Sequence, residues 1–159
     1  MVALRAPAGE TLPVAANVAI EFDPSLPDFA SSEFNGYLWS YPSAPVMQQT
    51  ALKVFQRVFG QVGTAPSVQQ PAVTLWITGS SLINPLMGYY YGRATATAFS
   101  GADTSGPPIA EYRGEGKASA MTYSLVGVQK AYEATFIEIA NRMLADPAFL
   151  KRVRARSVD

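Results

Sequence analysis

The chain of 159 residues contains no cysteine and no histidine. Their absence excludes the usual zinc sites, thiol nucleophiles and acyl-transfer sites in which histidine is the base. Carboxylate, lysine, tyrosine and backbone chemistry remain, and no motif in the sequence assembles them. We therefore expect no metal, no cofactor and no enzymatic activity. Because disulfides are also excluded, the cysteine content leaves the compartment open.

Charged residues are scarce as well, at 15% of the chain against a usual share of about 25%. Twelve Lys and Arg balance twelve Asp and Glu, so no net basic field favours a nucleic-acid partner. The one local excess of charge lies near the C-terminus and comprises Lys151, Arg152, Arg154 and Arg156. We interpret it as a solvated basic end of the chain, with contact to an anionic surface such as lipid headgroups as the alternative.

No window approaches the roughly 18 consecutive apolar residues of a membrane span, and the first residues lack the apolar run of a signal peptide. The initial Met is compatible with a mature chain from which an export signal or a lipid-bearing cysteine has been removed. Residues 1–13 are rich in Ala and Pro, which predicts a flexible tether. Residues 147–159 are expected to form a short basic tail, in which Asp146 and Pro147 can also cap a last helical turn.

Between these ends, residues 14–146 have the periodicity of a single α+β domain. Period-two alternation predicts strands at 14–22, 71–80, 88–100 and 109–120. Apolar residues spaced three and four apart predict helices at 43–63 and 127–146, the first with Ser43 as a candidate cap. The aromatic, proline-rich segment 23–45 is expected to lie along the core and to contain a short strand near 36–40.

This order, β-α-β-β-β-α, predicts an antiparallel sheet of about four strands. Both amphipathic helices would pack on one face, and the other face would be at least partly in contact with water. Within 88–100, one strand face carries small residues that let a helix approach closely, namely Gly92, Ala94, Ala96 and Ala98, beside Tyr90. The opposite face carries Tyr89, Tyr91, Arg93, Thr95, Thr97 and Phe99.

The stretch 80–99 places apolar side chains where a turn is expected. These side chains are Leu82, Ile83, Leu86 and Met87, and each would forgo roughly 1.5–3 kcal/mol if its own domain left it exposed. In that case another chain, a lipid or an apolar ligand would cover them. The alternative is an extension of the preceding strand, with Asn84 and Pro85 as its turn.

Aromatic residues next to this stretch extend the predicted contact surface. Aromatic side chains offer a large area together with a polar handle, which suits protein docking. We therefore add Trp76, Tyr89, Tyr90 and Tyr91 to the predicted partner-binding residues. The alternative is that these rings cover the sheet beneath the segment 23–45.

The segment 113–119, RGEGKAS, superficially resembles a phosphate-binding loop, but it lacks the first glycine of that motif. A loop of that kind needs a glycine five residues before the Gly-Lys pair, and the chain has Glu111 there. Glu111, Arg113 and Glu115 share one strand face, which we interpret as a solvated, charge-alternating outer face.

The element order resembles a group of small proteobacterial envelope lipoproteins, which includes the auxiliary lipoproteins of ABC-type transport systems and the lipopolysaccharide-assembly lipoproteins. The segments that carry the resemblance are YLWSYPSAPVMQQTALKVFQRVFG, the strand GRATATAF with its return GPPIAEYRGEGKAS, and the closing GVQKAYEATFIEIANRMLADP. The lipid-bearing cysteine of the group is missing here, and LINPLMGYYY has no assigned counterpart in it.

The resemblance implies a non-enzymatic structural or assembly subunit of the periplasm, with association at the outer membrane left open. Its partners would be other protein subunits of an envelope or secretion assembly, and self-association and lipid contact also stay open. The alternative, from another functional class, is a module of a transport system that binds an apolar ligand such as a lipid. Its cleft would lie at the small residues of the strands between 88 and 120.

Overall fold

The computed structural model describes residues 3–34, 37–84, 88–119 and 124–155. The strands are β1 (Val14–Phe22), β2 (Ala30–Phe34), β3 (Tyr37–Tyr41), β4 (Phe59–Thr64), β5 (Val73–Asn84), β6 (Tyr89–Ser100) and β7 (Ala110–Ser119). The helices are α1 (Ser43–Val58), α2 (Leu125–Leu144) and α3 (Pro147–Ala155). The α+β class is confirmed, and β3 lies where a short strand is predicted.

The main sheet is mixed and has five strands in the order β4-β1-β5-β6-β7, while β2 and β3 pair separately. β1 runs parallel to both of its neighbours, and only β5, β6 and β7 form the antiparallel meander. The prediction of an antiparallel sheet of about four strands is therefore wrong in detail. The alternation of side chains in the sequence shows which face of the sheet each residue lies on. It does not distinguish parallel from antiparallel pairing, because both directions have the same alternation.

β4 is the strand that the sequence pattern misses. The helix predicted over 43–63 ends at Val58, and the next residue, Phe59, is extended and completely buried. Gly60 and Gly63, which fall within the predicted helix 43–63, instead lie in β4, where Gly63 pairs with Ala19 of β1. The open edge of β1 supplies hydrogen-bond partners that a local reading of the sequence does not contain.

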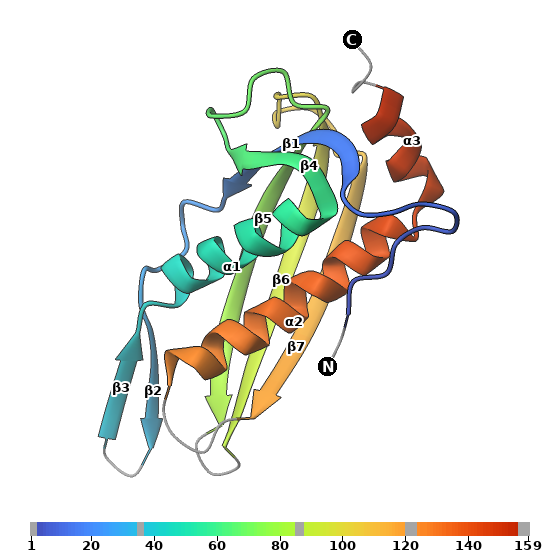
Figure 1. Ribbon diagram of the computed structural model, residues 1–159. Coiled ribbons are helices and arrows are strands. Elements are labelled where there is room, and N and C mark those ends of the chain that lie inside the picture. The colour runs from blue at the N-terminus through green and yellow to red at the C-terminus, as the bar shows by residue number, and fades with distance from the viewer. Residues whose placement is uncertain (1–2, 35–36, 85–87, 120–123, 156–159) are drawn as a thin grey trace.

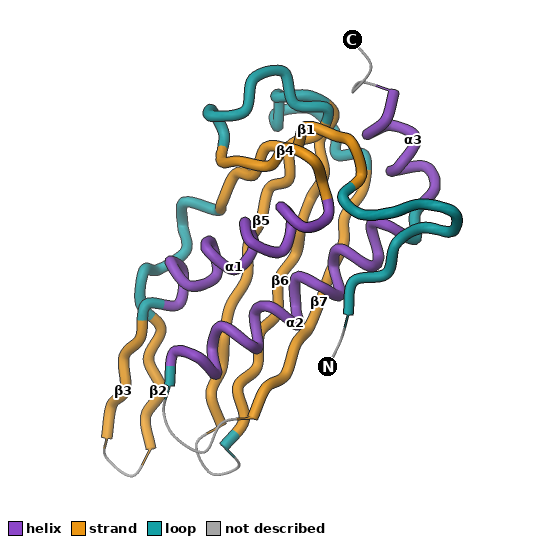
Figure 2. The backbone as a smooth tube through the Cα atoms, in the orientation of Figure 1, coloured by secondary structure: helices purple, strands orange, loops and turns teal. Residues whose placement is uncertain are grey.

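All three helices lie on the same side of β5, β6 and β7 (Figure 1). Figure 2 shows α1 and α2 next to each other across this face, with α3 at one end of the layer. Between them Phe55 contacts Phe136 and Phe59, with ring centroids 6.0 and 6.4 Å apart, and all three rings are fully buried. The core therefore lies between the helix layer and one face of the sheet, as the amphipathic pattern predicts.

α2 packs directly on the small-residue face of β6 and β7. A Cβ placed on Gly114 would lie 2.5 Å from the carbonyl oxygen of Thr135, and one on Gly92 would lie 2.7 Å from the Thr135 hydroxyl. Such distances are far inside van der Waals contact, so the glycines are what permits this helix position. The ligand cleft proposed at these small residues is thus occupied by α2.

The N-terminal segment from residue 3 and the C-terminal segment up to residue 155 fold onto the domain. In the segment predicted as a tether, the amide of Arg5 donates to Asn141 Oδ1 of α2 at 2.8 Å, and Leu4 and Leu12 are partly buried against the core. The segment predicted as a basic tail forms α3, whose Phe149 packs against Phe59 with ring centroids 6.3 Å apart. Over the described part of the chain, no helix combines the length and apolarity needed to cross a membrane.

Candidate docking surface at the end of the β5–β6 hairpin

The apolar stretch after residue 80 is the end of a long hairpin rather than a surface loop. β5 and β6 stay paired up to Asn84 and Tyr89, and Leu82 lies opposite Tyr91. The alternative interpretation, an extension of the strand, is thus confirmed as far as Asn84. Leu86 and Met87, which were predicted to bind a partner, lie outside the described residues.

Strict alternation along the two strands sends Ile83 and Tyr90 to the helix-covered face. They are 5% and 2% exposed, and the Tyr90 hydroxyl accepts a hydrogen bond of 2.9 Å from the amide of Ser124, which caps α2. Gly127 of α2 lies directly against the Tyr90 ring. Ile83 and Tyr90, which were predicted to bind a partner, are thus buried on the face that α2 covers.

The other face of the hairpin end carries a group of side chains that we call the hairpin cluster: Leu82, Tyr89, Tyr91 and Lys117. Leu82 is 63% exposed, and the two tyrosines are half-buried. The Lys117 ammonium lies 3.7 Å from the centroid of the Tyr89 ring and 5.7 Å from that of Tyr91. This cation–π contact holds the two rings beside Leu82 and joins β7 to the hairpin.

One step along the strands, the cluster borders a charged row. Arg93 of β6 and Glu115 of β7 are paired across the strands, and their side chains lie 3.7 Å apart. A cleft of 510 Å³ lies between this row and the cluster, with Ser80, Leu82 and Tyr91 also in its lining. The cleft therefore has one apolar and aromatic wall and one wall made of an exposed ion pair.

Exposed apolar side chains also occur at the start of α2, near the end of the hairpin. Among the described residues, the large hydrophobic side chains that are exposed are Phe29, Leu82, Leu125 and Val126. Leu125 and Val126 begin α2, directly after the Ser124 that bonds Tyr90. The start of α2 thus lies at the same end of the domain as the end of the β5–β6 hairpin, on the other side of the sheet (Figure 1).

Trp76 shares the open face but lies outside the cluster. It is half-buried and pairs with Glu21 of β1 and Thr97 of β6. Six residues of extended strand separate it from Leu82, which corresponds to roughly 20 Å. A partner that contacts both residues would have to cover much of the sheet.

The predicted basic residues lie in a different part of the molecule. Lys151, Arg152 and Arg154 are exposed on α3, and Arg156 lies outside the described residues. Arg154 pairs with Glu10 of the N-terminal segment. These cations do not contribute to the docking surface.

The buried polar groups have a structural role. Ser43, predicted as a helix cap, instead shares hydrogen bonds of 2.7 Å with Ser81 of β5 and with Tyr132 of α2. Burial raises the pKa of the Tyr132 hydroxyl, which keeps it neutral. Within the described ranges, no three acidic side chains come together as a metal site.

Sequence reasoning missed Lys117, Leu125 and Val126. Lys117 joins the cluster only through its pairing with Tyr91, and the strand register that sets this pairing depends on the whole hairpin. Leu125 and Val126 precede the predicted start of the helix at 127, and Ser124 followed by apolar residues was the available signal for an earlier start. The outer position predicted for Glu111, Arg113 and Glu115 is confirmed.

No family model matches the sequence, and no curated protein matches it. Among solved structures, a Xanthomonas campestris protein of the DUF330 family aligns over 99% of this chain and 97% of its own, with a TM-score of 0.54 and 10% identity. A putative lipoprotein from Caulobacter crescentus aligns over 87% of this chain and 90% of its own, with a TM-score of 0.41 and 8% identity. A minor lipoprotein from Acinetobacter baumannii aligns over 90% of this chain and 93% of its own, with a TM-score of 0.33 and 12% identity. The chain therefore has the fold of the DUF330 protein over nearly its whole length.

Proposed function

We propose that this protein is a non-enzymatic subunit of a cell-envelope assembly and that it docks on a partner protein through the hairpin cluster. The observation that carries the proposal is the exposure of Leu82 in the middle of an aromatic group on the face that the helices leave open. An apolar centre surrounded by tyrosines and ion-paired charges is the usual composition of a protein–protein contact.

Two features favour a protein over a small ligand at this surface. The cleft is bordered on one side by the exposed ion pair of Arg93 and Glu115, and a charged rim of this kind is typical of protein–protein contacts. The apolar side chains of Leu125 and Val126 extend the surface around the end of the molecule, as a partner with a broad contact area requires.

The envelope location is supported by the element order that resembles small envelope lipoproteins. The likeness to the DUF330 protein extends over almost the whole chain and shows the same fold. Fractionation of cells that produce the protein tests the location, and we expect the protein in the envelope fraction. Recovery from the cytosol alone would contradict it.

Site-specific photocrosslinking tests the docking surface. A photoreactive phenylalanine analogue at position 82 is expected to give one discrete protein adduct in intact cells. A matched probe at Lys53, exposed on α1, should give none. We further expect an adduct with the same protein from position 125, and expect the substitution Leu82→Glu to abolish that adduct.

Leu82→Glu is suited to this test because it changes an exposed side chain, and we expect the free energy of unfolding to change by no more than about 0.5 kcal/mol. An unchanged adduct from position 125 in the Leu82→Glu variant would contradict docking through the cluster. The same adduct from a probe at position 53 would show that crosslinking reflects the abundance of the captured protein rather than binding at a specific surface.

A further inference from the structure

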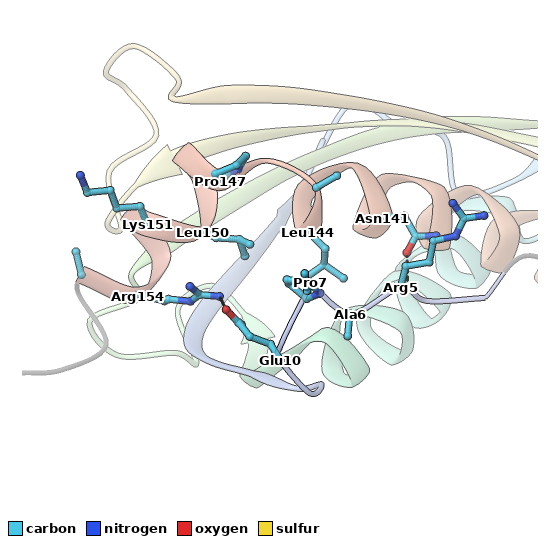
Figure 3. Close-up of a pocket in the computed structure, with 13 residues that line it drawn as sticks. Arg5, Ala6, Pro7, Glu10, Asn141, Leu144, Pro147, Leu150, Lys151 and Arg154 are labelled. Carbon is cyan, nitrogen blue, oxygen red and sulfur yellow. Dashed lines mark hydrogen bonds and ion pairs between the residues drawn. The ribbon is translucent and has the colours of Figure 1, made fainter.

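A second hollow, of 810 Å³, lies on the helix side of the protein, apart from the docking surface. It is an open groove between the N-terminal segment 5–10 and the junction of α2 with α3 (Figure 3). Its volume falls within the roughly 300–1,000 Å³ that small-molecule sites occupy. The inference drawn from it is independent of the proposed function.

The N-terminal segment crosses this hollow as a strap that is fixed at both ends. At one end Asn141 accepts from the amide of Arg5 at 2.8 Å and donates to the carbonyl of Ala3 at 3.0 Å. At the other end Glu10 forms an ion pair with Arg154 of α3. Among the hydrogen bonds of the described residues, none joins residues 6–9 to the helices. The middle of the strap is therefore not tied to the helices by hydrogen bonds, and its Ala6, Pro7 and Ala8 contribute to the lining.

The floor of the hollow is apolar. Leu144 at the end of α2 and Leu150 of α3 are buried beneath it, with Pro147 at the junction between the two helices. The strap faces this floor with Ala6 and Pro7 (Figure 3). The lining thus offers apolar surface from α2, α3 and the N-terminal segment, against which an alkyl chain can pack.

The rim of the hollow is basic. Its lining contains three cations, Arg5, Lys151 and Arg154, and one carboxylate, Glu10, which Arg154 already neutralises. No ion pair joins Arg5 or Lys151 to a carboxylate among the described residues. Figure 3 shows these two side chains at opposite ends of the hollow, where long flexible stems can carry their charges to its mouth.

We propose that this hollow binds a single-chain anionic amphiphile. The alkyl chain lies along Leu144 and Leu150 beneath the strap, and the acidic headgroup is held at the rim by Arg5 or Lys151. An apolar floor with cations that form no ion pair among the described residues is complementary to this ligand class in both polarity and charge. A fatty acid and a lysophospholipid both have one alkyl chain and an acidic headgroup. The experiment below distinguishes the carboxylate headgroup of the first from the phosphate headgroup of the second.

Isothermal titration calorimetry on the full chain tests the proposal with dodecanoate below its micelle concentration, lysophosphatidylglycerol and dodecanol. We expect one acidic amphiphile to bind with one molecule per chain, and dodecanol to bind more weakly. The double variant R5E/K151E should weaken binding roughly tenfold or more, because it removes both unpaired cations. Binding of dodecanoate identifies a carboxylate ligand, and binding of lysophosphatidylglycerol alone identifies a phosphate ligand.

Arg152→Glu is the control for position, since it makes the same charge change on α3 as Lys151→Glu does, but outside the lining. We expect it to leave the affinity unchanged. Equal losses in Arg152→Glu and R5E/K151E, or equal affinity for dodecanol, would overturn the proposal. So would binding to vesicles that contain phosphatidylglycerol without any binding of a monomeric amphiphile, since that result assigns the cations to a membrane surface. All three positions are exposed, and circular dichroism verifies that the variants fold.

Discussion

Tyr90 and Tyr91 are consecutive residues of β6 with opposite environments. Tyr90 is buried beneath the start of α2, where its hydroxyl accepts from the Ser124 amide, whereas Tyr91 stands on the open face beside Leu82 and Lys117. The residue type is the same, so composition does not decide between them. What differs is the face of the sheet on which each tyrosine lies. The residues two positions away along the strand, which share that face, indicate which face it is.

The two faces of the same strands have different requirements. The covered face must admit a helix, so it carries glycine and alanine where α2 approaches most closely. The open face carries Arg93, Glu115 and Lys117, whose long side chains would leave no room for a helix at that distance. Small residues on one face are thus evidence for a helix there, and large polar and aromatic residues on the other are evidence for an exposed surface.

The largest expected effect is the difference in the free energy of unfolding between Tyr90→Ala and Tyr91→Ala. Tyr90→Ala removes a buried ring and a hydrogen bond at the start of α2, and we expect the free energy of unfolding to fall by roughly 3–5 kcal/mol. Tyr91→Ala should lower it by less than about 1 kcal/mol, because the ring is half-exposed. Urea denaturation measures both values, and similar losses would contradict the assignment of faces.

A smaller effect is expected from Gly116, which lies opposite Gly92 on the covered face. A Cβ at this position would overlap the carbonyl oxygen of Ala131 and lie 2.6 Å from the amide nitrogen of Thr135. Both are backbone atoms of α2, so Gly116→Ala should displace the helix and cost roughly 1–3 kcal/mol. Its neighbour on the open face gives the matched control, and Lys117→Ala should cost no more than about 1 kcal/mol in the same assay. A neutral Gly116→Ala would show that α2 does not need this close approach.

The smallest expected effect is a pH dependence of the covered face. Burial of Tyr112 and its hydrogen bond of 2.6 Å to Asp146 raise the pKa of the tyrosine hydroxyl above its usual value. Because the folded protein holds this proton more tightly than the unfolded chain, the contribution is complete below about pH 10 and is lost as the pH rises further.

We therefore expect the free energy of unfolding to fall above about pH 10 by at most about 1.4 kcal/mol per pH unit for this group. Tyr112→Phe should make the fall less steep, which denaturation at a series of pH values measures. Tyr132, whose pKa burial also raises, should keep part of the pH dependence. An identical pH profile in Tyr112→Phe would exclude Tyr112 as a source of it.

The local elements were largely predictable because their signals are local. The apolar stripe that predicts a helix from Ser43 includes Met47, Val54 and Phe55, and the structure buries all three in α1. The small residues of β6 correctly indicated the face that a helix covers. Both signals repeat at the period of the element itself, so they are visible without knowledge of any neighbour.

The sheet arrangement and part of the candidate site were not predictable in this way. Phe59 follows α1 directly and becomes a strand because the edge of β1 is available to it. Lys117 reaches Tyr89 only through the register of β6 with β7. The hollow beneath the strap joins Arg5 to Lys151 across most of the chain length, and no spacing in the sequence records that contact.

The sequence by itself determined which residues alternate to which side of each strand and which stripe of each helix is apolar, because these follow from backbone geometry. Only the tertiary structure decided the strand directions, the register that assembles the hairpin cluster, and the docking of both chain ends beside α2. These depend on pairing between distant segments, where hydrogen bonds and packing choose among partners that are equivalent in the local pattern.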